Sequence, residues 1–250
     1  MNILGIIPAR YASTRFPGKP LIDLAGKTMI RRVYEQAQKA SSLADVVVAT
    51  DDERIFKAVK AFKGNVIMTS DKHQSGTDRC AEVSKKMIGF DAIINIQGDE
   101  PLIDPKQINL LASCFNDIST ELATLVKKIE TAEELFNPNT PKVIINKRSE
   151  AIYFSRQVIP YLKNVAPEDL LSKHTFYKHI GIYGYRTTTL GIISKIPIGN
   201  LEKAEMLEQL RWIESGYKIK VAQTKSESLA IDSPDDVERV LATLNSKKKK

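Results

Sequence analysis

The segment IIPARYASTRFPGKPL, residues 6–21, starts as an apolar run and then carries three cations, Arg10, Arg15 and Lys19, among small residues. Backbone N–H groups of such a loop can converge on an anion, and arginine and lysine side chains neutralise phosphate oxygens. The glycine patterns of a Walker A loop and of a dinucleotide-binding loop are absent from it. The segment therefore predicts a phosphate site of another kind, and the alternative is a basic loop exposed to solvent.

Acidic residues follow a later apolar run in the segment NIQGDEPLI, which contains Asp99 and Glu100, and a further aspartate, Asp232, lies in the segment LAIDSPDD. Magnesium ions in proteins usually bind one or two carboxylates together with waters and the phosphates of a substrate. By themselves, Asp99 and Asp232 are equally typical of turns and helix starts. Together with the basic loop, they predict a Mg²⁺-dependent site for a nucleoside triphosphate.

The elements that must position these residues alternate along the first hundred residues. Short β-branched runs at 3–7, 46–49, 66–68 and 92–96 are separated by periodic segments at 28–39, 52–62 and 78–87. Alternating strands and helices predict a parallel sheet with helices on both faces. Ligands bind such sheets outside the carboxyl ends of the strands, where Arg10 and Asp99 stand.

The later half is less regular. Strands are predicted at 122–129, 143–146, 151–156, 176–186 and 219–222, with one amphipathic helix over 201–215. Ser233 is predicted as the cap of a last helix that begins at Pro234. We therefore expect a Rossmann-like α/β fold with a mostly parallel sheet flanked by helices and an antiparallel portion in the C-terminal half. Residues 1–245 are expected to form a single domain, and residues 246–250 a basic tail.

Composition excludes several classes of protein. The 250 residues are 42% apolar and 27% charged, which suits a globular chain with a proper core. No apolar run approaches the roughly 20 residues of a membrane span, and no signal peptide precedes the first strand, so we expect a cytoplasmic protein. The net charge of +7 includes the run Lys247–Lys250 and is otherwise interspersed with acids, which argues against nucleic acid as a partner. Cys80 and Cys114 have no metal-site spacing and are predicted to be structural thiols.

Eight motifs in order resemble the 3-deoxy-manno-octulosonate (Kdo) cytidylyltransferase family of sugar nucleotidyltransferases. They are IIPARYASTRFPGKPL, VVATDD, HQSGTDR, NIQGDEPLI, YFSR, HIGIYGYR, EMLEQLR and AIDSPDD, and they extend from Ile3 to about Leu241. The resemblance implies a homodimer that activates Kdo with CTP and Mg²⁺ for lipopolysaccharide assembly and releases pyrophosphate. Asp78 and Phe16 stand where the family usually has Glu and Leu.

The resemblance also implies roles for individual residues. The triphosphate would be held by Arg10, Ser13, Arg15 and Lys19. Cytidine would bind at Ser75, Arg79 and the backbone of residues 8–9, where a carbonyl could accept a hydrogen bond from the cytosine amino group. Kdo would bind through Gln97, His179, Tyr183, Glu208 and Gln209, with Arg156 as the partner of its carboxylate, and Mg²⁺ through Asp99 and Asp232.

These residues suit a direct transfer in which the anomeric hydroxyl of Kdo attacks the α-phosphorus of CTP. Arg10, Lys19 and a Mg²⁺ ion on Asp99 and Asp232 would neutralise charge, and no general base is assigned. Taken singly, His179 also suits a structural histidine, and Glu208 and Gln209 an exposed helix surface. Two alternatives stay open: a relative that activates 8-amino-Kdo or a sialic acid, and a non-catalytic protein that binds CTP or nucleic acid.

Overall fold

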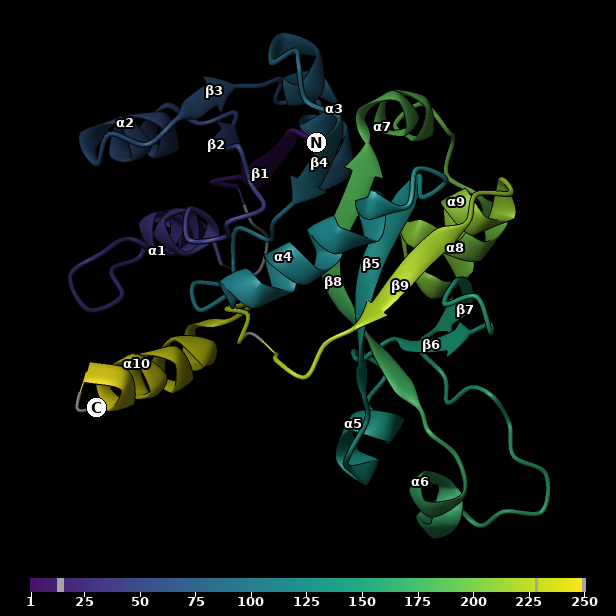
Figure 1. Ribbon diagram of the computed structural model, residues 1–250. Coiled ribbons are helices and arrows are strands. Elements are labelled where there is room, and N and C mark those ends of the chain that lie inside the picture. The colour runs from purple at the N-terminus through teal and green to yellow at the C-terminus, as the bar shows by residue number, and fades with distance from the viewer. Residues whose placement is uncertain (13–15, 228, 249–250) are drawn as a thin grey trace.

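The computed structural model describes residues 1–12, 16–227 and 229–248 (Figure 1). Its strands are β1 (Ile3–Ala9), β2 (Asp45–Thr50), β3 (Val66–Met68), β4 (Ala92–Asn95), β5 (Leu122–Lys128), β6 (Lys142–Ile145), β7 (Ala151–Ser155), β8 (Tyr177–Arg186) and β9 (Ile219–Gln223). Its α-helices are α1 (Met29–Ala37), α2 (Glu53–Ala61), α3 (Gly76–Lys86), α4 (Pro105–Ser113), α5 (Ala132–Phe136), α6 (Leu170–Lys173), α7 (Thr187–Ile193), α8 (Asn200–Glu205), α9 (Gln209–Glu214) and α10 (Pro234–Lys248).

Most of the strands form one sheet whose order is β3-β2-β1-β4-β8-β5-β9, with β6 and β7 joined to it beside β8. The pairs β1–β2, β1–β4, β2–β3 and β5–β9 are parallel. β8 runs antiparallel to its neighbours β4 and β5. Of the seven strands in this described order, β8 alone is reversed, which confirms the mostly parallel sheet with an antiparallel portion in the C-terminal half.

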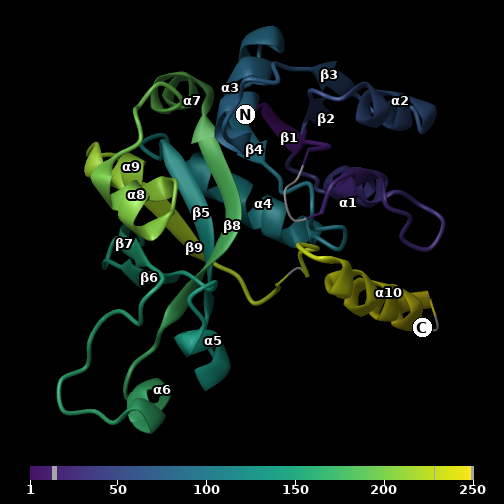
Figure 2. The same ribbon diagram turned by 180° about the vertical axis from the view of Figure 1, so that it is seen from behind.

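Helices cover both faces of the sheet, because successive strand residues point to opposite faces and both faces are apolar. Ile3 and Ile7 of β1 pack into the core shared with α1, α2 and α4. Leu4 and Ile6 pack into the opposite core, with α3, α7 and α9. Figures 1 and 2 show the two helical layers from the front and from behind. No helix in the described ranges is long and apolar enough to cross a membrane.

The chain returns from β9 to the ends of β1 and β4 through a segment that leads into α10 (Figure 1). Ile231 in this segment and Val240 of α10 pack against Leu24 and Met29. The Ile231 N–H also donates a hydrogen bond of 2.9 Å to the carbonyl oxygen of Asp99. These contacts bring the predicted Asp232 turn next to the end of β4, although the two are far apart in sequence.

The predicted single helix over 201–215 is wrong. α8 ends at Glu205, α9 begins at Gln209, and Met206 between them has a φ of 52°, in the left-handed region that ends a helix. Met206 is exposed, whereas Leu207 and Gln209 are buried. The left-handed Met206 thus separates the two helices, and the residues directly after it are buried.

Cys114 was placed in a predicted helix, and it is the C-cap of α4, but no bounds were predicted for α4 to α7. The start of α4 nevertheless has a sequence signal. Asp104 caps the helix by accepting a hydrogen bond of 2.9 Å from the Lys106 N–H, and Pro105 is its first residue. The last helix begins at Pro234 as predicted, but it continues to Lys248 and so includes part of the expected basic tail. Residues 249–250 lie outside the described residues.

Candidate active site

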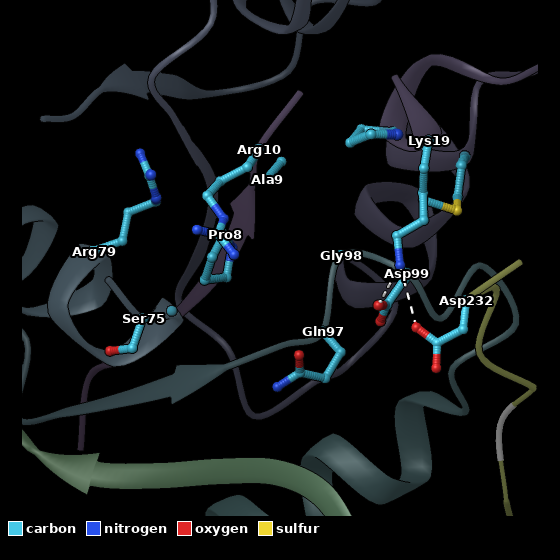
Figure 3. Close-up of a pocket in the computed structure, with 13 residues that line it drawn as sticks. Pro8, Ala9, Arg10, Lys19, Ser75, Arg79, Gln97, Gly98, Asp99 and Asp232 are labelled. Carbon is cyan, nitrogen blue, oxygen red and sulfur yellow. Dashed lines mark hydrogen bonds and ion pairs between the residues drawn. The ribbon is translucent and has the colours of Figure 1, made fainter. Parts of the chain in front are cut away.

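A cleft of about 250 Å³ opens at the carboxyl ends of β1 and β4 (Figure 3). It lies where open α/β sheets bind their ligands. Its lining comes from the end of β1, the turn at Lys19–Leu21, the start of α3, the loop after β4 and the turn before α10. The structure thereby brings together seven predicted site residues: Arg10, Lys19, Ser75, Arg79, Gln97, Asp99 and Asp232.

Lys19 is the centre of a charged group on one side of this cleft. Its Nζ lies 2.8 Å from Asp99 Oδ2 and 3.6 Å from Asp232 Oδ1, and it donates a hydrogen bond of 2.8 Å to the Ile231 carbonyl oxygen (Figure 3). Its side chain is largely buried, which strengthens these contacts relative to a surface ion pair. Two carboxylates thus share one ammonium group, and this corner keeps a net negative charge beside the cleft.

The corner suits a magnesium ion. Asp99 and Asp232 supply hard oxygen donors from two different elements, and their negative charge exceeds that of Lys19. Among the described residues no group of three or more His, Cys, Asp and Glu side chains could hold a metal by themselves. Two carboxylates supply only part of a metal's coordination shell. This suits Mg²⁺, which takes its other ligands from water and substrate phosphates.

Gly98 lies where the loop after β4 approaches the end of β1. A Cβ atom at this position would lie 2.6 Å from the carbonyl oxygen of Pro8, closer than real Cβ contacts allow. The loop after β4 can therefore approach the end of β1 only because residue 98 has no side chain. Pro8 lines the cleft, where the resemblance places the backbone contacts to cytosine.

Ser75 and Arg79 lie on the side of the cleft away from Lys19 (Figure 3). Ser75 caps α3 by accepting from the Asp78 N–H at 3.1 Å, while the Asp78 carboxylate accepts from the Ser75 N–H at 3.2 Å. Asp78 therefore completes a capping box, although its side chain is shorter than that of the Glu usual in the family at this position. Arg79 is buried, and its guanidinium donates to Asp51 Oδ2 at 2.8 Å and to the hydroxyl of Thr69. These contacts tie Arg79 to the ends of β2 and β3, so its side chain fixes one wall of the cleft.

Gln97 contacts a buried region between β4, β8 and α9. We call this region, which contains Asn95, Tyr183, Gln209 and Trp212, the polar floor. Gln97 Nε2 donates to the Gly181 carbonyl of β8 at 2.7 Å. Four of the five buried side-chain polar atoms without a hydrogen-bond partner among the described residues lie in these elements: Asn95 Oδ1, Tyr183 Oη, Gln209 Nε2 and Trp212 Nε1. Asn95 and Tyr183 are paired across β4 and β8, and the rings of Tyr183 and Trp212 are 5.2 Å apart.

Such atoms cost about 1–3 kcal/mol each when they stay unpartnered. Unpartnered donors and acceptors in these neighbouring elements suit a ligand rich in hydroxyl groups. Tyr183 and Gln209 were predicted as sugar-binding residues. Asn95 and Trp212 were not, although Asn95 begins one of the quoted motifs and Trp212 is the single tryptophan of the chain.

His179 sits against the polar floor, between the rings of Phe154 and Tyr183. Thr124 Oγ1 lies 2.7 Å from the Ile182 carbonyl oxygen and 2.9 Å from His179 Nε2, and a hydroxyl that donates to the carbonyl accepts from an Nε2–H of the imidazole. This tautomer leaves Nδ1 as an acceptor. Burial lowers the pKa of His179 to about 3, and the imidazole is therefore neutral at physiological pH.

The neutral His179 predicts a loss of stability in mild acid. The unfolded chain takes up a proton near pH 6.5, whereas the folded chain resists it down to about pH 3, so the free energy of unfolding falls as the pH drops through 6.5. The free energy of unfolding should fall by about 2 kcal/mol less between pH 7 and pH 5 in His179→Gln than in the wild type, measured by urea unfolding. The exposed His174→Gln is the control. Equal pH slopes for the two variants would contradict a buried neutral His179.

Glu208 connects the polar floor to the cleft. Burial raises the pKa of its carboxyl group, and the Thr77 hydroxyl donates a hydrogen bond of 2.8 Å to Glu208 Oε2. Thr77 belongs to the first turn of α3, next to the Ser75 cap that lines the cleft. Gln209 is thus buried and Glu208 partly buried, unlike the exposed helix surface that their sequence also suited.

The remaining predicted residues lie elsewhere. The Arg156 guanidinium donates to the backbone carbonyls of Glu205, Pro138 and Met206, and Arg156 is not part of the cleft lining. Its role toward a sugar carboxylate stays a prediction. Ser13 and Arg15 lie outside the described residues.

A strand-end cleft with cations and with two aspartates on one side suits the binding and transfer of a nucleotide, the chemistry of nucleotidyltransferases. The family model of cytidylyltransferases matches residues 4–219. The chain is 57% identical to the 3-deoxy-manno-octulosonate cytidylyltransferase of Parabacteroides distasonis, over 98% of both chains. It is also 57% identical to the protein of that name from Bacteroides thetaiotaomicron, over 95% of this chain and 96% of the relative.

A solved structure of CMP:2-keto-3-deoxy-manno-octonic acid synthetase complexed with CTP superposes with a TM-score of 0.92. It is 42% identical, over 99% of this chain and all of that one. The chain belongs to the cytidylyltransferase family, within the group of 3-deoxy-manno-octulosonate cytidylyltransferases.

Proposed function

We propose that the chain transfers the CMP group of CTP to Kdo, which gives CMP-Kdo and pyrophosphate for lipopolysaccharide biosynthesis. One observation carries this most directly: a charged cleft suited to a triphosphate adjoins a buried floor of unpartnered polar atoms suited to a polyhydroxylated sugar. The relatives that match nearly the whole chain are named for this reaction, and the superposed structure was solved with CTP.

In the proposed reaction the anomeric oxygen of Kdo forms a bond to the α-phosphorus of CTP. The bond from that phosphorus to the bridging oxygen of pyrophosphate breaks, and the proton of the anomeric hydroxyl passes to solvent. Arg10 and Lys19 line the cleft as cations and stabilise the charge on the phosphate oxygens. The polar floor orients the sugar, so that positioning and electrostatics lower the barrier without a covalent intermediate.

Mg²⁺ is the proposed cofactor, and Asp99 and Asp232 would hold it. When bound, it would neutralise phosphate charge. The proposal rests on the shared contacts of these aspartates with Lys19 and on their position in the cleft lining. A homodimer and a cytoplasmic location belong to the same proposal, and the homodimer rests on the resemblance to the family.

Pyrophosphate release should require both CTP and Kdo, with ATP and GTP at least tenfold less effective, because a purine base is larger than the pyrimidine expected beside Pro8 and Ser75. UTP should also be poor, since uracil lacks the amino group that a backbone carbonyl can bind. A coupled pyrophosphate assay with each nucleotide, and with Kdo, 8-amino-Kdo and a sialic acid in turn, measures this. Equal rates with all four nucleotides, or a preference for another acid sugar, would contradict the proposed substrates.

A further inference from the structure

A backbone hydrogen bond of 2.9 Å, from the Gly18 N–H to the Tyr11 carbonyl oxygen, joins two described residues of the basic loop. Arg10 directly precedes this bond and Lys19 directly follows it, and both residues line the cleft. The spacing between the two cations therefore depends on how firmly residues 11 and 18 are held together. None of the roles assigned to the site so far involves Tyr11.

The Tyr11 side chain is fixed from two sides. A Cβ atom on Gly18, whose φ is +74°, would lie 3.1 Å from the Tyr11 ring, so the loop closes directly against the ring. On α2, the guanidinium carbon of Arg54 lies 3.2 Å from the centroid of the same ring. A cation at this distance from an aromatic ring is attracted by the ring's quadrupole.

Arg54 is itself held in place. Its Nε and Nη2 donate to the two carboxylate oxygens of Asp52 at 3.0 and 2.7 Å, and Asp52 also caps α2 by accepting from the Arg54 N–H at 2.9 Å. A bidentate pair of this kind fixes the plane of the guanidinium. The contacts run in one series, from the start of α2 through Asp52 and Arg54 to Tyr11 and the closed loop.

We propose that Tyr11 is a positioning residue for the triphosphate, and that Arg54 and Asp52 hold its ring so that Arg10 and Lys19 keep their spacing. This rests on the proposed function of the cleft. The Arg54 side chain is 59% exposed, so its contact with Tyr11 contributes little to the core. What the contact restrains is the loop. The effect should appear in the binding of phosphate groups rather than in the stability of the fold.

Calorimetric titration with CTP and with CMP tests this without relying on turnover. Tyr11→Ala should weaken CTP binding at least tenfold and CMP binding less than twofold, because CMP lacks the two outer phosphates. Tyr11→Phe keeps the ring and should bind CTP within about twofold of the wild type. Arg54→Gln changes an exposed side chain and should weaken CTP binding at least threefold, with a smaller loss for CMP. It replaces Tyr11→Ala as the test if that variant does not fold.

The matched control is Arg31→Gln, since Arg31 also lies over an aromatic ring, that of Phe62, but on α1 and 5.7 Å from its centroid. It should leave both affinities unchanged. Wild-type affinity for CTP in Tyr11→Ala or in Arg54→Gln would overturn the proposal, as would equal losses for CTP and CMP. A wild-type chain that binds no CTP would instead overturn the proposed function itself, which separates the two failures.

Discussion

Replacing Asp99 or Asp232 by Asn should lower kcat with CTP and Kdo at least about a hundredfold, or about 2.7 kcal/mol of transition-state stabilisation. Each change removes one of the two negative charges that share Lys19 and that would hold Mg²⁺. Asparagine keeps the size and much of the hydrogen bonding, so the variants should stay folded. The Mg²⁺ concentration for half-maximal activity should rise in both.

The control for this pair is Asp235→Asn, an exposed residue in the first turn of α10, three positions after Asp232. It changes the charge of the same turn and should leave kcat and the Mg²⁺ requirement unchanged. Near-normal turnover with unchanged Mg²⁺ dependence in either Asp99→Asn or Asp232→Asn would show that these aspartates have only turn and capping roles. Circular dichroism of each variant separates loss of the site from loss of the fold.

Lys19→Gln should have the larger effect, a fall of about a thousandfold in kcat/KM, or about 4 kcal/mol. The change removes a cation from the triphosphate cleft and leaves Asp99 and Asp232 without the ammonium that they share. It also removes the hydrogen bond to Ile231, which helps to hold the turn before α10 beside β4. Steady-state rates with CTP varied at saturating Kdo measure the loss.

Lys27→Gln is the matched control, because Lys27 also makes a short ion pair, 2.6 Å to Glu35, but lies outside the cleft lining. It should retain wild-type kcat/KM. A Lys19→Gln variant within tenfold of the wild type would mean that Lys19 serves only to join the α10 turn to β4. Lys19→Arg, which keeps the charge but changes its shape, should fall between the two.

The sequence predicted the parallel half of the sheet well, because each strand there is a short apolar run between amphipathic helices. It also placed Arg10 and Asp99 at strand ends, and the rule for ligand positions in such sheets made them candidates together. Asp232 was proposed as the metal-binding partner of Asp99 from its residue type, and the resemblance assigned it the same role. Nothing in the spacing of two residues so far apart says that α10 returns to β4.

Contacts that form only between distant segments escaped the sequence analysis. The break between α8 and α9 depends on a left-handed Met206, a residue type that gives no local signal for that conformation. Arg79 looked like a ligand contact, but its pairing with Asp51 was not predicted. Asn95 and Trp212 became candidates only when the fold placed their unpartnered atoms in the elements that carry Tyr183 and Gln209.

³¹P nuclear magnetic resonance of the reaction mixture with Mg²⁺ follows the transfer of CMP from CTP to Kdo at each phosphorus atom. The three CTP resonances should disappear while one phosphodiester resonance and that of pyrophosphate grow in equal molar amounts, and only when Kdo is present. Release of orthophosphate, formation of a phosphomonoester of Kdo, or an unchanged CTP spectrum with a folded protein would contradict it.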